Sequence, residues 1–392
     1  MFIIKIVEKS VDRKAHRPAL TTERRSRRSW GIFCRKDFCT NLLIHNLLTI
    51  FAQISLCIIV SCFDFVYIHI MITKQISDNE LSNFINSLYP DEMSVFVMAG
   101  GRFRGALFHG TRFVNQMRAQ HNLGILETQV LGQACLSGAL LLPTMKGREY
   151  VIFRYDTNGP AAGFSVETDS KGTVRGYLLQ DPIPIDKPLE NWDLSQFFGN
   201  GTLTISRLPE GSREFQTGTV EIKHKNISKD LAWYFQQSEQ THTAFNTSIM
   251  MDKQGRVIGA GGMFLQKMPF EGGKSKSSSG KDDEFASISD EELVAKVEHA
   301  FSACPSLGQW FSEGGDADDI IYGLFREFKP SVALRRDVKF DCPCSKEKFL
   351  AHVKALSKAE LDDIKKNGPD PLEIVCHNCS SVYNINVSEL DK

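Results

Sequence analysis

Four cysteines near the C-terminal end of the chain have the spacing of a metal site. Cys342 and Cys344 form a Cys-x-Cys pair, and after residues 345–375 the chain reaches Cys376 and Cys379, which form a Cys-x-x-Cys pair. Zinc is held by four thiolates when each half-site is local and the intervening chain folds back. The spacing therefore predicts one Zn²⁺ ion on these four cysteines.

The interval between the two pairs is small and highly charged. Segments of this size with little to bury usually need a metal or a cross-link in order to fold. We expect the interval to form a helical hairpin that depends on the metal and melts when the metal is removed. Its few apolar residues are Phe349, Leu350, Val353, Leu356, Leu361, Ile364, Leu372, Ile374 and Val375.

The residues alone leave several interpretations of this centre open. A static zinc ribbon is one, and His377 in place of one cysteine ligand is a variant of it. Because thiolates can be oxidised although zinc cannot, a redox switch is another. A thiol-disulfide oxidoreductase using Cys376 and Cys379 is a third, but such an enzyme would carry this motif at a helix N-terminus after a strand.

The preceding sequence predicts a mixed α+β domain. Ser77 to Glu80 begin a helix that ends at Pro90, and another helix is expected over residues 227–236. Residues 123–142 resemble a membrane span in length only, because Glu127 and two glutamines favour a buried core helix. Alternating β-branched and aromatic residues predict strands at 94–98, 102–108, 149–155, 163–167, 173–179, 202–207, 216–222, 247–251 and 257–265.

A helical linker is expected between this domain and the cysteines. Residues 271–283 are rich in glycine, serine and lysine and predict a mobile surface loop. Ser289 to Glu292 form a capping box, which opens an apolar but interrupted helical region that continues to the metal segment. Such a region is stable only when it is docked on another surface.

Residues 1–70 differ from the rest of the chain. A basic stretch precedes the apolar run 42–62, which is the pattern of a signal anchor, although His45, Asn46 and Gln53 dilute it. The interpretation we favour is a gene-model artefact with the true start at Met71. Without this extension the chain is acidic, which suits a soluble cytoplasmic protein.

Composition excludes several classes of function. A net charge of −1 gives no argument for nucleic-acid binding. No nucleotide-binding loop, nucleophile elbow or zinc-protease motif occurs, so we predict no catalytic residue and no enzyme. The ten cysteines are not spaced as a disulfide framework, which favours a reducing compartment. We expect Cys135 and Cys304 to be small buried hydrophobic residues.

Several motifs resemble the heat shock protein 33 family of redox-regulated 33 kDa chaperonins. The first two are residues 340–348, with Cys342 and Cys344, and residues 376–379. The others are Gly199-Asn200-Gly201, residues 234–240 and residues 261–269, all in the family's order. The chain departs from the pattern at Ser380, where a glycine would permit a left-handed turn, at His242 in place of proline and at Lys348 in place of arginine.

This resemblance implies a function and a site. It implies an ATP-independent holdase of the stress response that is inactive when reduced. Oxidation would pair Cys342 with Cys344 and Cys376 with Cys379, expel the zinc, and loosen the chain from about Ser287 onward. The exposed apolar surface would bind unfolding client proteins, and the active form would be a homodimer in the cytoplasm, with no membrane or nucleic acid as partner of residues 71–392.

The expected organisation is therefore an α+β protein in five parts. They are an extension (1–70), a mixed-sheet substrate-binding core domain (71–270), a flexible loop (271–286), a helical linker (287–335) and a small C-terminal zinc-binding redox-switch domain (336–392).

Overall fold

The computed structural model describes residues 79–185, 189, 191–269, 285 and 287–391. Our interpretations of residues 1–70 and of the loop 271–283 lie outside the described residues. The chain divides into two compact units. The larger comprises residues 74–342 with 378–380, and the smaller includes residues 343–377 with 381–392. The mixed α+β class is confirmed, while the five-part division stays a prediction.

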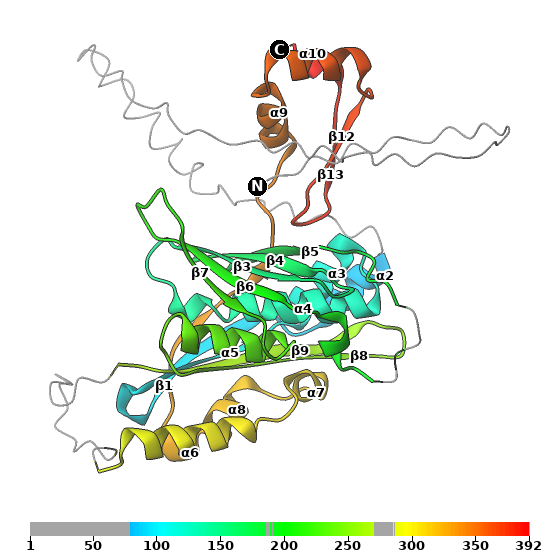
Figure 1. Cartoon of the computed structure of the whole chain (residues 1–392). Coiled ribbons are helices and arrows are strands. Elements are labelled where there is room, and N and C mark those ends of the chain that lie inside the picture. The colour runs from blue at the N-terminus through cyan, green and yellow to red at the C-terminus, as the bar shows by residue number, and fades with distance from the viewer. Residues whose placement is uncertain (1–78, 186–188, 190, 270–284, 286, 392) are drawn as a thin grey trace, which may run out of the picture. The chain divides into compact units, whose positions relative to one another are not determined.

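Two β-sheets form the framework of the larger unit, the first antiparallel throughout and the second antiparallel except at one edge strand (Figure 1). The five-stranded sheet, called sheet A below, has the order β10-β1-β2-β9-β8. The six-stranded sheet, called sheet B, has the order β11-β5-β4-β3-β6-β7. Sheet A contains β1 (Glu92–Met98), β2 (Phe103–His109), β8 (Thr243–Met251), β9 (Val257–Lys267) and β10 (Ser331–Arg336). Sheet B contains β3 (Tyr150–Thr157), β4 (Gly163–Asp169), β5 (Thr173–Leu178), β6 (Gly201–Leu208), β7 (Gln216–Glu221) and β11 (Lys339–Phe340).

The predicted core helix is α4 (Ile125–Ala139), which contacts strands of both sheets. Residues 125–144 have the length and composition of a membrane span, but 89% of that window is buried inside the protein. Its one acidic residue has a partner there, since Glu127 Oε1 accepts a hydrogen bond of 2.9 Å from the Ile183 backbone N–H. The expectation of a core helix is confirmed, and the absence of a polar face follows from its place between two sheets.

The other helices of this layer are α2 (Asn79–Ser87), α3 (Thr111–His121) and α5 (Ile227–Gln237). Sequence analysis predicted α2 and α5 but missed α3. Gly110 precedes α3 and provides no capping side chain, so the usual start signal is missing.

Sheet A is buried on both faces because alternate residues of its strands enter two separate hydrophobic clusters. Phe108 and Phe264 belong to the cluster shared with α4 and sheet B. Leu107, Met263 and Leu265 belong to the second cluster, on the opposite face.

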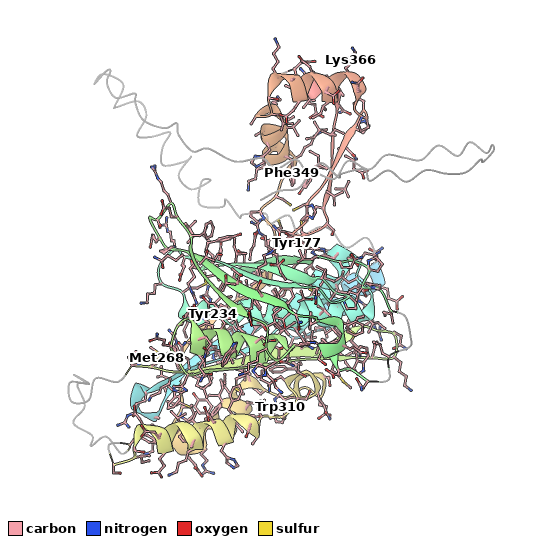
Figure 2. The ribbon with its side chains drawn as sticks, in the orientation of Figure 1. Tyr177, Tyr234, Met268, Trp310, Phe349 and Lys366 are labelled. Atoms are coloured by element: carbon pink, nitrogen blue, oxygen red, sulfur yellow. The ribbon has the colours of Figure 1, made fainter. Side chains whose placement is uncertain are left out.

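Three helices cover that second face, and we call them the linker helices: α6 (Asp290–Ser302), α7 (Leu307–Ser312) and α8 (Ala317–Leu324). Figure 2 shows the side chains between these helices and the sheet, with Trp310 of α7 labelled. Ser289 caps α6 by accepting from the Glu292 N–H, which is one half of the predicted capping box, while the Glu292 carboxylate pairs with Lys296 at 2.8 Å. The backbone of α7 packs directly on the backbone of β9. Any side chain in place of Gly259 would clash there, because its Cβ would lie 2.0 Å from the Gly308 carbonyl oxygen.

One expectation for the linker was wrong. Residues 331–335 were predicted to belong to the helical linker, but they lie in β10, which pairs antiparallel with β1 at the edge of sheet A. Pro330 ends the helical run, and the free edge of β1 provides the partner that a short sequence such as SVALRR needs in order to be extended.

The smaller unit contains the expected helical hairpin. Its helices are α9 (Lys346–Lys354) and α10 (Lys358–Asn367), and its hairpin strands are β12 (Leu372–Val375) and β13 (Val382–Ile385). Ser345 caps α9, and Ser357 with Glu360 forms a full capping box on α10. Among the described residues of this unit, the buried apolar side chains are few: Phe349, Val353, Leu372, Ile374, Ile385 and Leu390. So small a core fits a segment whose folding depends on a metal.

Candidate metal centre

The four predicted cysteines lie together. The sulfur atoms of Cys342, Cys344, Cys376 and Cys379 are all within 4.8 Å of one another, and each residue is at most 6% exposed. Zinc–thiolate bonds of about 2.3 Å place the sulfurs of a regular tetrahedron about 3.8 Å apart. The donor set and its spacing therefore fit a four-coordinate soft metal ion such as zinc. His377, the alternative ligand, is not part of the group.

Secondary structure positions each half of the centre. Cys342 follows β11 by two residues, and Cys344 directly precedes the N-cap of α9. Cys376 follows β12, Cys379 precedes β13, and the Cys376 N–H donates to the Ser381 carbonyl at 2.9 Å to close the turn. A β-hairpin turn thus presents one pair of thiols, and a strand-to-helix junction presents the other.

Three residues around the centre were not found from the sequence. The Tyr383 hydroxyl lies 3.1 Å from Cys344 Sγ and donates to the Cys344 carbonyl at 3.2 Å. Arg175 Nη1 donates to Cys342 Sγ at 3.4 Å. His121 contacts the turn between Cys376 and Cys379, with Nε2 3.2 Å from the Asn378 carbonyl oxygen. All three are distant in sequence from the groups they contact, so no local pattern could have indicated them.

Ser380 adopts the conformation that sequence analysis expected a glycine to provide. Its φ is 53°, in the left-handed region, and its Oγ lies 2.8 Å from His121 Nδ1. A left-handed residue with a side chain costs about 1–2 kcal/mol, whereas a hydrogen bond contributes about 1 kcal/mol. The serine therefore offsets most of the backbone cost with its side-chain contact.

This balance predicts different results for two substitutions. Ser380→Ala loses the hydrogen bond and keeps the strain, so it should destabilise the metal-loaded protein by about 1 kcal/mol. Ser380→Gly loses the bond but relieves the strain, so its stability should stay close to that of the wild type. Thermal unfolding of both zinc-loaded variants measures the difference. Equal destabilisation by alanine and glycine would contradict the assignment of strain to this position.

A sequence model described as the Hsp33 protein matches residues 91–386, which is well over half of the chain. The chain belongs to the Hsp33 family. The resemblance identified from the cysteine motifs is thereby confirmed. Family membership supports a chaperone function, and it is consistent with the prediction that the chain is not an enzyme.

This chain aligns with nearly the whole length of curated Hsp33 relatives. The "33 kDa chaperonin" of Thermoanaerobacter sp. (strain X514) is 30% identical over 285 residues, which cover 71% of this chain and 90% of the relative. That of Synechococcus elongatus is 29% identical over 307 residues, covering 77% and 96%. The crystal structure of the Hsp33 homologue from Thermotoga maritima superposes with a TM-score of 0.64 at 26% identity, covering 77% of this chain and 97% of that one.

The interface between the linker helices and sheet A is the second feature of this Hsp33 chain that bears on function. Phe96 of β1 and Phe325, at the end of α8, are both fully buried, with ring centroids 5.7 Å apart. His109 of β2 stacks on Phe311 of α7 at 4.1 Å, with an interplanar angle of 17°. If the helices left the sheet, the buried side chains of this cluster on both surfaces would meet water.

His109 should make linker docking depend on pH. Burial lowers the pKa of His109 to about 4, Arg112 acts in the same direction, and Asp316 opposes them. The unfolded value is about 6.5, so the neutral form contributes its full stability above that pH, and the contribution is lost as the pH falls from 6.5 through 4. Binding of a hydrophobic dye to reduced protein should therefore increase between pH 7 and 5. His109→Phe keeps an aromatic ring on Phe311 and should flatten the change; an identical pH profile in this variant would contradict the prediction.

Proposed function

We propose that this Hsp33 chain is an ATP-independent holdase whose activity is switched on by oxidation of the four-cysteine centre. The observation that carries the proposal is the set of four buried sulfurs within 4.8 Å, in a chain whose relatives are named chaperonins. In the reduced state Cys342, Cys344, Cys376 and Cys379 hold one Zn²⁺ ion, and the linker helices cover sheet A.

Oxidation converts each thiol pair into a disulfide. With hydrogen peroxide as oxidant, each pair of thiolates, Cys342 with Cys344 and Cys376 with Cys379, gives two electrons to one peroxide, which takes up two protons from the solvent and leaves as two waters. The disulfide sulfurs carry no negative charge, so all four ligands are lost and the zinc is released. The small core of the C-terminal unit cannot remain folded without them.

Loss of the centre then loosens the chain before it. Between the linker helices and Cys342 lie one short 3-10 turn (Arg326–Phe328) and the edge strands β10 and β11, and β11 pairs over two residues. Without an anchored end at Cys342 these strands release, the linker helices undock, and the apolar face of sheet A becomes available to unfolding client proteins. The proposal includes a homodimeric active form and a cytoplasmic location during oxidative stress.

A thiol-disulfide oxidoreductase is less well supported. Cys376 and Cys379 lie between two strands of a hairpin, and no helix begins at either of them. The thiolate stabilisation that such enzymes obtain from a helix N-terminus is therefore missing at this position.

The decisive experiment measures zinc, thiols and activity together. Reduced protein is treated with peroxide and mild heat, released zinc is quantified with a chromogenic chelator, thiols are counted, and aggregation of a denatured client is followed by light scattering. We expect one zinc released, four thiols lost per chain, and suppression that appears only after treatment. Retained zinc with unchanged suppression would support a static zinc ribbon and reject the switch.

A further inference from the structure

A cluster of polar side chains lies on sheet B beside the first cysteine. Glu167 of β4 and Arg175 of β5 are directly opposite each other across the strands, and Arg175 Nε donates to Glu167 Oε2 at 2.5 Å. The Tyr150 hydroxyl of β3 donates to the same carboxylate and accepts from Arg175 Nη2 at 3.2 Å. The Arg175 and Glu167 side chains are only 17% and 15% exposed, so the guanidinium is held in one orientation.

The strand register brings Cys342 to this guanidinium. β11 pairs in parallel with β5, with Phe340 opposite Val174, and the Asp341 N–H donates to the Val174 carbonyl at 3.0 Å. Phe340 is buried and packs edge-on against Phe113 at 5.9 Å, which fixes the strand. Cys342 follows directly, and its sulfur accepts from Arg175 Nη1 at 3.4 Å.

A cation at this position has a clear electrostatic effect on a thiolate centre. Four thiolates around a divalent ion leave a net charge of about −2. Here that charge would be buried, since the four cysteines are at most 6% exposed. A charge-assisted hydrogen bond from a guanidinium offsets part of it. Outer partners of this kind typically change metal affinity by about 10- to 100-fold when they are removed.

We propose that Arg175 is a positioning residue of the metal centre: the core sheet holds Cys342 as a thiolate ligand through the Arg175 guanidinium, and so contributes to metal retention in the reduced protein. The proposal rests on the proposed function, in which the four cysteines hold zinc. It assigns to a core-domain residue a share in setting how readily the centre releases its metal, in addition to the four ligands themselves.

The test compares zinc retention in reduced full-length variants by competition with a chromogenic chelator. Arg175→Met keeps much of the side-chain volume without the charge and should release zinc at a chelator concentration about 10-fold or more below that of the wild type. Arg175→Lys keeps the charge and should recover most of the loss. Arg154→Met is the matched control, because Arg154 on β3 of the same sheet pairs with Asp156 at 2.6 Å and is not among the residues that contact the centre.

Several outcomes would overturn the proposal. Wild-type retention in Arg175→Met would show that the contact has no effect on the metal. Equal loss in the Met and Lys variants, or loss in Arg154→Met as well, would show a general effect on the sheet rather than an effect of charge at Cys342. Thermal unfolding of each variant identifies such a general effect. If the wild type itself binds no zinc, the proposed function fails, whereas zinc release by oxidation with an unaffected Arg175→Met rejects this inference alone.

Discussion

Phe325→Ala is expected to suppress client aggregation under fully reducing conditions, in which the proposed function requires the wild type to be inactive. Phe325 is completely buried at the end of α8, and its ring centroid lies 5.7 Å from that of Phe96 in sheet A. Truncating a buried phenylalanine costs about 3–5 kcal/mol. Because the cluster under the linker helices is separate from the main core cluster, we expect a cost of this size to undock the helices and leave the core folded.

The measurement is light scattering of a heat-denatured client, together with binding of a hydrophobic dye. Tyr322→Ala is the matched control, since Tyr322 lies on the same helix but is 45% exposed and should behave as wild type. The zinc content of both variants should stay at one per chain. A Phe325→Ala protein that is less stable to heat but neither binds dye nor protects a client would show that the covered face is not the client surface.

Cys379→Ser is expected to abolish zinc retention and unfold the C-terminal unit without any oxidant. A serine hydroxyl is a poor ligand, and metal binding of a structural site supplies about 10–16 kcal/mol of folding free energy. The few buried apolar residues in the described part of this unit cannot replace that free energy. Helices α9 and α10 should then melt, which lowers the helical circular dichroism signal. The same loss should follow treatment of reduced wild type with a strong chelator.

Cys304→Ser provides the control for general effects of removing a thiol. Cys304 lies at the end of α6, outside the four-cysteine group, and burial raises its pKa to about 11, so it is a poor nucleophile. This variant should retain its zinc and its peroxide response. If Cys379→Ser kept one zinc per chain, Cys379 would not be a ligand and the four-cysteine centre would have to be reassigned.

The parts of this protein that could be predicted from its sequence depend on local patterns. Cys342 lies near Cys344, and Cys376 near Cys379, because the two cysteines of each half-site are only two or three residues apart in the sequence. The polar residues of α4 favoured a core helix over a membrane span, and the helix is buried in the structure. The left-handed turn at Ser380 could be expected because zinc knuckles usually need one there.

The parts that could not be predicted depend on distant partners. β10 is a strand because β1 offers it a free edge, and nothing in residues 331–336 alone specifies that edge. Arg175 meets Cys342 only through the parallel register of β11 with β5, across more than 160 residues of sequence. His121 and Tyr383 approach the centre in the same indirect way. Contacts of this kind are fixed by strand order.

The two separate hydrophobic clusters of sheet A bear on how the linker helices could dock again after they have left the sheet. The cluster shared with α4 and sheet B is complete without the linker helices, so their departure removes one layer and leaves the remaining layers intact. Gly259 has no side chain, so it leaves room on the exposed sheet for the backbone of α7 at Gly308. In the proposed redox cycle, the folded sheet would act as a template on which the linker refolds once the cysteines are reduced, and each cycle would require only a local refolding step.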